Sequence, residues 1–299
     1  MGNALLLFLF HDLYGIINKN ITGGVHMKIG VRIKNMVDIA ANIEKVAGLG
    51  FHSCQLNSFD TSCYTDETVR IVLEACAKHD VTISTFWAGW SGPRVWNFTE
   101  GPTTLGLLPE QYRTARIADL KAGADFAKKL GVTQIATHAG FIPEDPNDPQ
   151  FYPMMDAIRE VAQYCKDLGL KFLFETGQET PVVLLRAIET IGTDNLGLNL
   201  DTANPILYGK ANPVDMMEML GDYVCDVHIK DGMWPTDGWN LGKETPVGQG
   251  KVDFAKIIRM LKDRGYDGAL TIEREISGDE QIRDILSAKA LLEKLLAEE

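Results

Sequence analysis

One short pattern recurs along this chain of 299 residues: a helical segment that ends in glycine and leads directly into an apolar run. It occurs as IEKVAGLGF (43–51), ADFAKKLGV (124–132), AQYCKDLGL (162–170) and IRMLKDRGY (258–266). A glycine that follows a helix with Lys or Arg in its last turn is a signal for the helix to stop. Its repetition indicates a helix-and-strand unit used several times, which favours an α/β fold.

Eight apolar runs rich in strand-forming residues alternate with the helical segments. The expected strands are residues 28–33, 53–57, 81–89, 134–140, 172–177, 196–204, 226–232 and 269–275. Eight such units in a chain of this length predict a single-domain (β/α)8 TIM barrel that covers residues 27–299. A doubly wound open sheet is the alternative, but no GxGxxG motif follows the first expected strand to support it.

Residues 1–26 are expected to form an N-terminal extension outside the barrel. Their apolar run, ALLLFLF (4–10), has seven residues and no Lys or Arg before it. It is too short to span a bilayer, and it lacks the good cleavage site of a signal peptide. The sequence MKIGVRI, which starts at Met27, is instead typical of the opening of an α/β protein.

The net charge limits which binding partners are expected, and the cysteines indicate the cellular compartment. A net charge of −12, from 41 acidic and 29 basic residues, disfavours nucleic acid and anionic membranes as partners. The five cysteines, at 54, 63, 76, 165 and 225, are odd in number and form no CxxC pair. This pattern is typical of reduced thiols, so we expect a cytoplasmic protein.

Four consecutive expected strands end in residues that can bind a metal ion. They are Glu175 in FLFETG, Asp201 in NLDTAN, His228 in DVHIKD and Glu273 in LTIERE. Each residue alone also has a structural interpretation, as an ion-pair partner, a cap or a buried histidine. Together they predict one divalent metal site, because the carboxyl ends of barrel strands open on one face. Mn²⁺ is the expected ion, and Mg²⁺, Co²⁺ and Zn²⁺ are compatible with the same ligand types.

Further candidates lie near the same face. His138, at the end of the fourth expected strand, is a candidate general base or substrate ligand, with a structural imidazole as the alternative. Four polar residues are candidates for binding substrate hydroxyls or an anion: Asn204, Lys230, Asp231 and Lys251. Four tryptophans are candidates for stacking on a sugar ring, with loop packing as the alternative: Trp87, Trp90, Trp234 and Trp239. Two long connections, 90–107 and 233–254, are expected to wall the pocket.

The motifs FETG, NLDTAN, VHIKDG, VGQGKVDF and GYDGALTIERE resemble those of the sugar phosphate isomerase/epimerase family, within the xylose isomerase-like TIM barrel superfamily. The resemblance covers nearly all of residues 27–299. It implies a metal held by Glu175, Asp201, His228 and Glu273. It also implies that Glu175 and Glu273 face opposite sides of a sugar, sugar phosphate or polyol, and transfer a proton next to its carbonyl through a metal-stabilised enediolate.

Two positions depart from the ketohexose 3-epimerases of this family, which place a histidine three residues after the metal-binding aspartate and an arginine six residues after the metal-binding histidine. This chain has Asn204 and Trp234 there, which argues against a free ketohexose 3-epimerase. Asn204 and the total of six histidines also argue against a DNA repair endonuclease with three zinc ions.

Two other functions stay open. One is a metal-dependent lyase or dehydratase on keto-sugars or 3-keto glycosides, with His138 as the base. The other is a non-catalytic, sugar-binding barrel that serves as a subunit of a larger complex. Either a homo-oligomer or a hetero-complex is compatible with the sequence.

Overall fold

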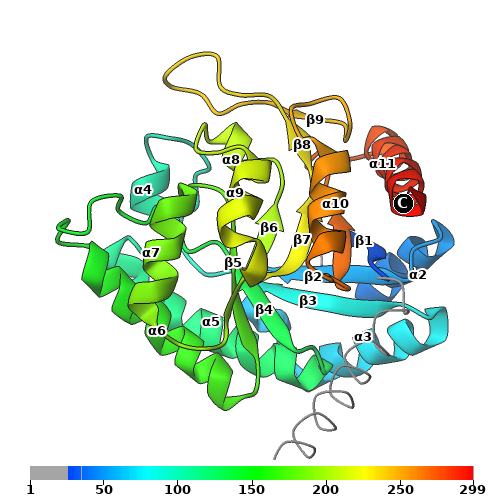
Figure 1. Ribbon diagram of the computed structural model, residues 1–299. Coiled ribbons are helices and arrows are strands. Elements are labelled where there is room, and N and C mark those ends of the chain that lie inside the picture. The colour runs from blue at the N-terminus through cyan, green and yellow to red at the C-terminus, as the bar shows by residue number, and fades with distance from the viewer. Residues whose placement is uncertain (1–25, 35, 299) are drawn as a thin grey trace, which may run out of the picture.

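The computed structural model describes residues 26–34 and 36–298, which form a closed barrel of parallel strands with helices on its outside (Figure 1). The barrel strands are β1 Lys28–Ile33, β2 Ser53–Ser58, β3 Thr82–Ala88, β4 Gln134–Thr137, β5 Lys171–Glu175, β6 Leu196–Asp201, β7 Val224–Ile229 and β10 Ala269–Ile272. Their order around the barrel follows the chain, and β1 closes the ring by pairing with both β2 and β10. The prediction of a (β/α)8 barrel is confirmed. The predicted extension, 1–26, lies outside the described residues except for His26.

Helices cover the outer surface of the barrel (Figure 1). They are α2 Ile39–Gly48, α3 Asp66–His79, α5 Glu110–Leu130, α6 Phe151–Asp167, α7 Pro181–Ile191, α9 Pro213–Leu220, α10 Phe254–Asp263 and α11 Asp279–Ala297. Helix α10 buries Phe254, Ile257, Ile258 and Leu261, which the 3.6-residue period places on one face. The two short helices α4 Gly101–Thr104 and α8 Asn204–Leu207 lie in loops that follow strand ends.

The glycines of the recurring pattern act as the predicted helix stops. Gly50, Gly131, Gly169 and Gly265 have φ values of 78°, 74°, 73° and 68°. Residues other than glycine rarely adopt this left-handed conformation, which reverses the chain direction from the helix into the next strand.

The inside of the barrel is polar as well as apolar. Trp87, Ala136 and Leu173 form a small apolar cluster of their own, apart from the main core between strands and helices. The side chains of Gln55, Asn199 and Asp226 are also buried, and hydrogen bonds join Gln55 to the other two. Buried polar groups must be hydrogen-bonded to be tolerated, so this interior is built to hold side chains in fixed orientations.

The 90–107 loop is fastened at both ends by one side chain, Arg116 of α5. Its guanidinium is fully buried and lies 4.1 Å from the ring centroid of Trp90. It donates hydrogen bonds of 2.6–3.0 Å to the backbone carbonyls of Ser91, Pro93, Thr104 and Gly106. Burial lowers the pKa of Arg116 to about 10, which still leaves it charged at neutral pH. The loop ends are therefore fixed to the barrel wall.

The 233–254 loop has a different construction. A small antiparallel pair at its base, β8 Asp231–Gly232 and β9 Glu244–Thr245, was not expected from the sequence. The Asp231 carboxylate accepts hydrogen bonds from the backbone amides of Gly232, Gly248, Gly250 and Val252. A side chain at Gly250 would collide with that carboxylate, which explains the second glycine of GQGK. Between β8 and β9 the loop extends away from the barrel, at the top of Figure 1.

The remaining expectations concern the membrane and the cysteines. In residues 26–34 and 36–298, no helix has both the length and the apolar character needed to cross a bilayer. All five cysteines are free, as their spacing predicted, and Cys54, Cys76 and Cys165 are buried.

Candidate functional site

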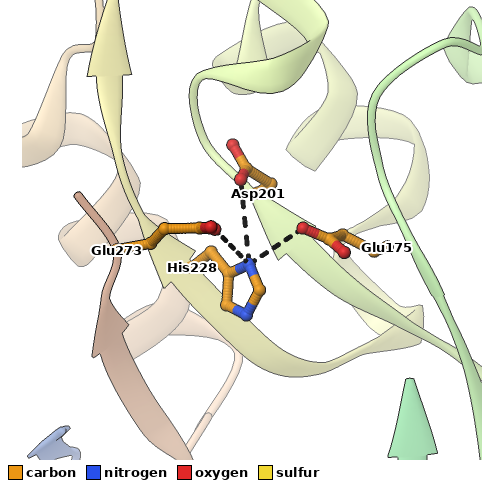
Figure 2. Close-up of side chains that lie close together, drawn as sticks. All are labelled: Glu175, Asp201, His228 and Glu273. Atoms are coloured by element: carbon orange, nitrogen blue, oxygen red, sulfur yellow. Dashed lines mark hydrogen bonds and ion pairs between the residues drawn. The ribbon is translucent and has the colours of Figure 1, made fainter. Parts of the chain in front are cut away.

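Four side chains from consecutive barrel strands meet at the carboxyl end of the barrel. Glu175 ends β5, Asp201 ends β6, His228 lies in β7 and Glu273 follows β10. One potential ligand atom of each lies within 4.8 Å of the others, and all four side chains are buried. Figure 2 shows the three carboxylates converging on the imidazole. The residues predicted to form a metal site are therefore brought together.

The carboxylates surround one nitrogen of His228. Its Nδ1 atom lies 3.0 Å from Glu273 Oε2, 3.1 Å from Glu175 Oε1 and 3.7 Å from Asp201 Oδ2. Burial alone would lower the pKa of His228, but the surrounding carboxylates, Glu175 first, raise this pKa well above its usual value. The centre thus strongly favours a positive charge.

Two carboxylate oxygens at this centre leave room for a ligand. Asp201 Oδ2 and Glu273 Oε2 are buried and accept no hydrogen bond from the described residues. The other Asp201 oxygen is held by the backbone amides of Ala203 and Asn204, at 2.8 and 2.7 Å. Buried carboxylate oxygens that accept no hydrogen bond and lie beside one imidazole are the donors that a divalent cation takes, so these residues fit such an ion.

A hydrogen-bonded chain below the centre orients His228. Its Nε2 atom lies 2.7 Å from Gln55 Oε1, which can only accept, so Nε2 carries a hydrogen. Nδ1 faces the carboxylates, and in the neutral ring it is the nitrogen left to bind a metal ion. The Gln55 amide nitrogen donates to Asn199 and to Asp226, at 3.0 and 3.2 Å. We did not predict these partners, although Gln55 and Asp226 are conspicuous as polar residues inside apolar strands.

Glu175 and Glu273 both stay ionised. Burial opposes ionisation of Glu175, but His138 and His228 lower its pKa to about 2. Its Oε2 accepts a hydrogen bond from the Trp87 indole and lies 3.3 Å from His138 Nε2. Burial likewise opposes ionisation of Glu273. The nearby positive charges, of which Arg32 has the largest effect, hold its pKa well below its usual value.

His138 lies in the wall of the site. Burial lowers its pKa, and Glu175 only partly offsets that effect. Its Nδ1 is buried and accepts no hydrogen bond from the described residues. A side chain at Gly177 would press against the His138 ring, which accounts for the glycine of FETG. A lowered pKa favours the neutral form of the imidazole, and in that form it can accept a proton.

A pocket of about 430 Å³ opens above the centre, a volume that suits a small molecule. Four of the predicted substrate-binding residues line it: Trp87, His138, Asn204 and Lys230. The buried Lys230 ammonium lies 3.1 Å from Asn204 Oδ1 and 3.0 Å from Glu275 Oε2. The pocket therefore combines an acidic floor with donors along one side.

The other predicted residues lie elsewhere. Lys251 is exposed and is not among the residues that line the pocket. Trp90 is buried against Arg116, while Trp234 and Trp239 are 40% and 75% exposed on the 233–254 loop. None of these three tryptophans lines the pocket.

Several side chains that line the pocket were not predicted: Arg32, Lys34, Phe59, Arg94, Trp96 and Tyr208. Arg32 and Lys34 lie at the end of β1. A search for polar residues at the end of that strand, as was made for β5, β6, β7 and β10, would have found them. Arg94 and Trp96 are on the 90–107 loop, whose conformation no motif indicated.

Comparison with known families agrees with this geometry. The model of the xylose isomerase-like TIM barrel family matches residues 43–295. The chain belongs to that family. In the crystal structure of a xylose isomerase domain protein from Planctomyces limnophilus, 29% identical, the same fold aligns with a TM-score of 0.82 over 90% of this chain and 96% of the other.

Two kinds of curated relative of this xylose isomerase-like barrel are enzymes. Fructoselysine 3-epimerase from Escherichia coli O157:H7 is 29% identical over 183 residues, which are 58% of this chain and 63% of that protein. Inosose dehydratase from Geobacillus kaustophilus is 27% identical over 146 residues, 43% of this chain and 46% of that protein. The chain thus matches less than two thirds of either enzyme.

Proposed function

We propose that this protein is a divalent-metal-dependent isomerase or epimerase that transfers a proton next to the carbonyl of a sugar, sugar phosphate or polyol. The convergence of three buried carboxylates on His228 Nδ1, at the floor of a sugar-sized pocket, carries this proposal. A divalent ion held there by Glu175, Asp201, His228 and Glu273 would act as a Lewis acid toward the carbonyl and the adjacent hydroxyl. Mn²⁺ is the ion we expect, with Mg²⁺, Co²⁺ and Zn²⁺ as the other candidates.

The two glutamates supply the bases in this proposal. Strands β6 and β7 separate β5 from β10 around the barrel, so Glu175 and Glu273 approach the substrate from different sides. One carboxylate takes the proton and the other returns it, which inverts a carbon or moves the carbonyl. Trp87 and His138 hold Glu175, while Arg32 and Lys34 hold Glu273.

His138 favours a second candidate, a metal-dependent lyase or dehydratase acting on keto-sugars or 3-keto glycosides. Its ring lines the pocket, and its buried Nδ1 has no hydrogen-bond partner among the described residues. Such an imidazole could take the proton next to the carbonyl and then protonate the departing oxygen. The similarity to inosose dehydratase supports this candidate.

Deuterium incorporation distinguishes the two candidates. The Mn²⁺-loaded protein is incubated in deuterated water with ketoses, sugar phosphates and keto-inositols, and the products are followed by NMR. An isomerase or epimerase puts deuterium on a carbon next to the carbonyl of an intact sugar. A lyase accumulates an unsaturated or deglycosylated product, and His138→Gln should abolish that product.

A protein that binds Mn²⁺ but neither exchanges a proton nor forms an elimination product with any of these compounds would contradict both enzymatic proposals. It would instead support the non-catalytic, sugar-binding subunit.

A further inference from the structure

Arg94 is a cation at the rim of the pocket. It projects from the 90–107 loop, and its guanidinium carbon lies 4.1 Å from the centroid of the Phe59 ring. Among residues 26–34 and 36–298, no carboxylate lies within ion-pair distance of Arg94. The other cations that line the pocket do have such partners, since Arg32 and Lys34 pair with Glu273 and Lys230 pairs with Glu275.

The charges around the pocket leave a positive excess once a divalent ion is bound. The carboxylates at the floor and wall are Glu175, Asp201, Glu273 and Glu275. An equal number of cations faces them: Arg32, Lys34, Arg94 and Lys230. The charge of a bound ion would then be uncompensated, in a chain whose net charge is −12. A local field of this sign attracts an anion.

A series of contacts links Arg94 to the metal centre. The Phe59 ring is 5.0 Å from that of Trp87, and the Trp87 indole donates to Glu175. The rings of Phe59 and Trp87 therefore connect the guanidinium to Glu175 at the floor. Arg94 is exposed to solvent, so its donors can be reached by a ligand. Because Arg116 fixes both ends of the 90–107 loop, Arg94 is presented from an anchored segment.

We infer that the substrate carries a carboxylate or a phosphate on the end remote from its carbonyl, and that Arg94 binds this anion beside Phe59. The inference rests on the proposed function of the metal site, which places the carbonyl at the floor. A planar guanidinium can donate two parallel hydrogen bonds to either anion, a geometry that lysine cannot reproduce. The neutral part of the substrate would then lie along Trp87 and Trp96.

Three ketoses that differ only at carbon 6 test the inference: D-fructose, D-fructuronate and D-fructose 6-phosphate. Binding to the Mn²⁺-loaded protein is measured by calorimetry for the wild type and for Arg94→Gln. We expect at least one anion to bind the wild type about tenfold more tightly than fructose. Arg94→Gln should lose that preference, because the amide supplies neither the charge nor the paired donors. Tighter binding of D-fructuronate would indicate a carboxylate on the substrate, and tighter binding of D-fructose 6-phosphate would indicate a phosphate.

Two control variants accompany this measurement. Arg259→Gln removes an equal charge from the exposed side of α10, and it should keep the preference. Arg94→Lys keeps the charge without the paired donors, and it should keep only part of the preference. A wild type that binds neither anion better than fructose, or an Arg94→Gln variant with an unchanged preference, overturns the inference.

The measurement also separates this inference from the proposed function. Mn²⁺ binding and deuterium exchange on ketoses, without any anion preference, would leave the enzymatic proposal intact and refute the role of Arg94. An anion preference that depends on Arg94, without Mn²⁺ binding or exchange, would refute the enzyme and retain the anion subsite.

Discussion

The floor and the rim of the pocket are built by different means. The floor consists of side chains at the ends of barrel strands, held by partners such as Gln55 and Arg32. The rim consists of loops, and Arg116 anchors one of them while the other projects into solvent. This difference suggests that the floor determines which chemistry is possible, and the rim which molecule undergoes it.

The largest expected effect comes from removing a carboxylate of the floor. Glu175→Gln keeps the size of the side chain but removes a ligand and a base together, so turnover should fall about 10²–10⁴-fold. Calorimetry should show much weaker Mn²⁺ binding, while circular dichroism should show an intact fold. A variant with unchanged activity would show that Glu175 is a strand end without a function.

Arg116→Met tests whether the rim can be loosened without disturbing the floor. The substitution leaves four backbone carbonyls of the loop without their donor, so we expect the free energy of unfolding to fall by about 3 kcal/mol. Ligand binding in the pocket should weaken, whereas Mn²⁺ affinity should stay close to that of the wild type.

The exposed Arg70→Met on α3 is the control for Arg116→Met, because its ion pairs lie at the surface and should contribute little. If Arg116→Met weakens Mn²⁺ binding as much as ligand binding, floor and rim are not separate units.

Gln55→Leu tests whether the floor can be disturbed without disturbing the rim. It removes the acceptor that fixes the tautomer of His228, so Mn²⁺ affinity should fall about 10–100-fold. The rim should be untouched, and the preference among the three carbon-6 ketoses should persist. An unchanged Mn²⁺ affinity would mean that the carboxylates alone orient the imidazole.

The smallest effect is expected for Trp239→Ser on the projecting part of the 233–254 loop. The side chain is 75% exposed and does not line the pocket, so stability should change by less than about 0.5 kcal/mol. Turnover and Mn²⁺ affinity should equal those of the wild type. A large loss of turnover would indicate that this loop closes over the substrate.

The same division explains which features the sequence predicted. Glu175, Asp201, His228 and Glu273 could be placed together because strand position alone determines where a strand-end residue lies in a closed barrel. The helix stops were visible because a left-handed turn needs glycine. These features depend on local chemistry and on one topological rule.

The rim could not be predicted in this way. Arg116 looks like any arginine of a helix until the loop carbonyls are placed around it, and Arg94 and Trp96 carry no motif. The pair β8 and β9 depends on hydrogen bonds from Asp231 to distant glycines. Such contacts join residues whose spacing in the chain follows no repeat.

The anchoring of the 90–107 loop by Arg116 has a consequence for how this protein could evolve. The entropic cost of closing a loop grows only slowly with its length, so residues between the two anchored ends can be replaced or inserted at little cost to the fold. The segment from Arg94 to Thr103 lies between those ends. Changes in this segment can therefore alter which substrate is bound during evolution, while the residues at the floor and their chemistry stay the same.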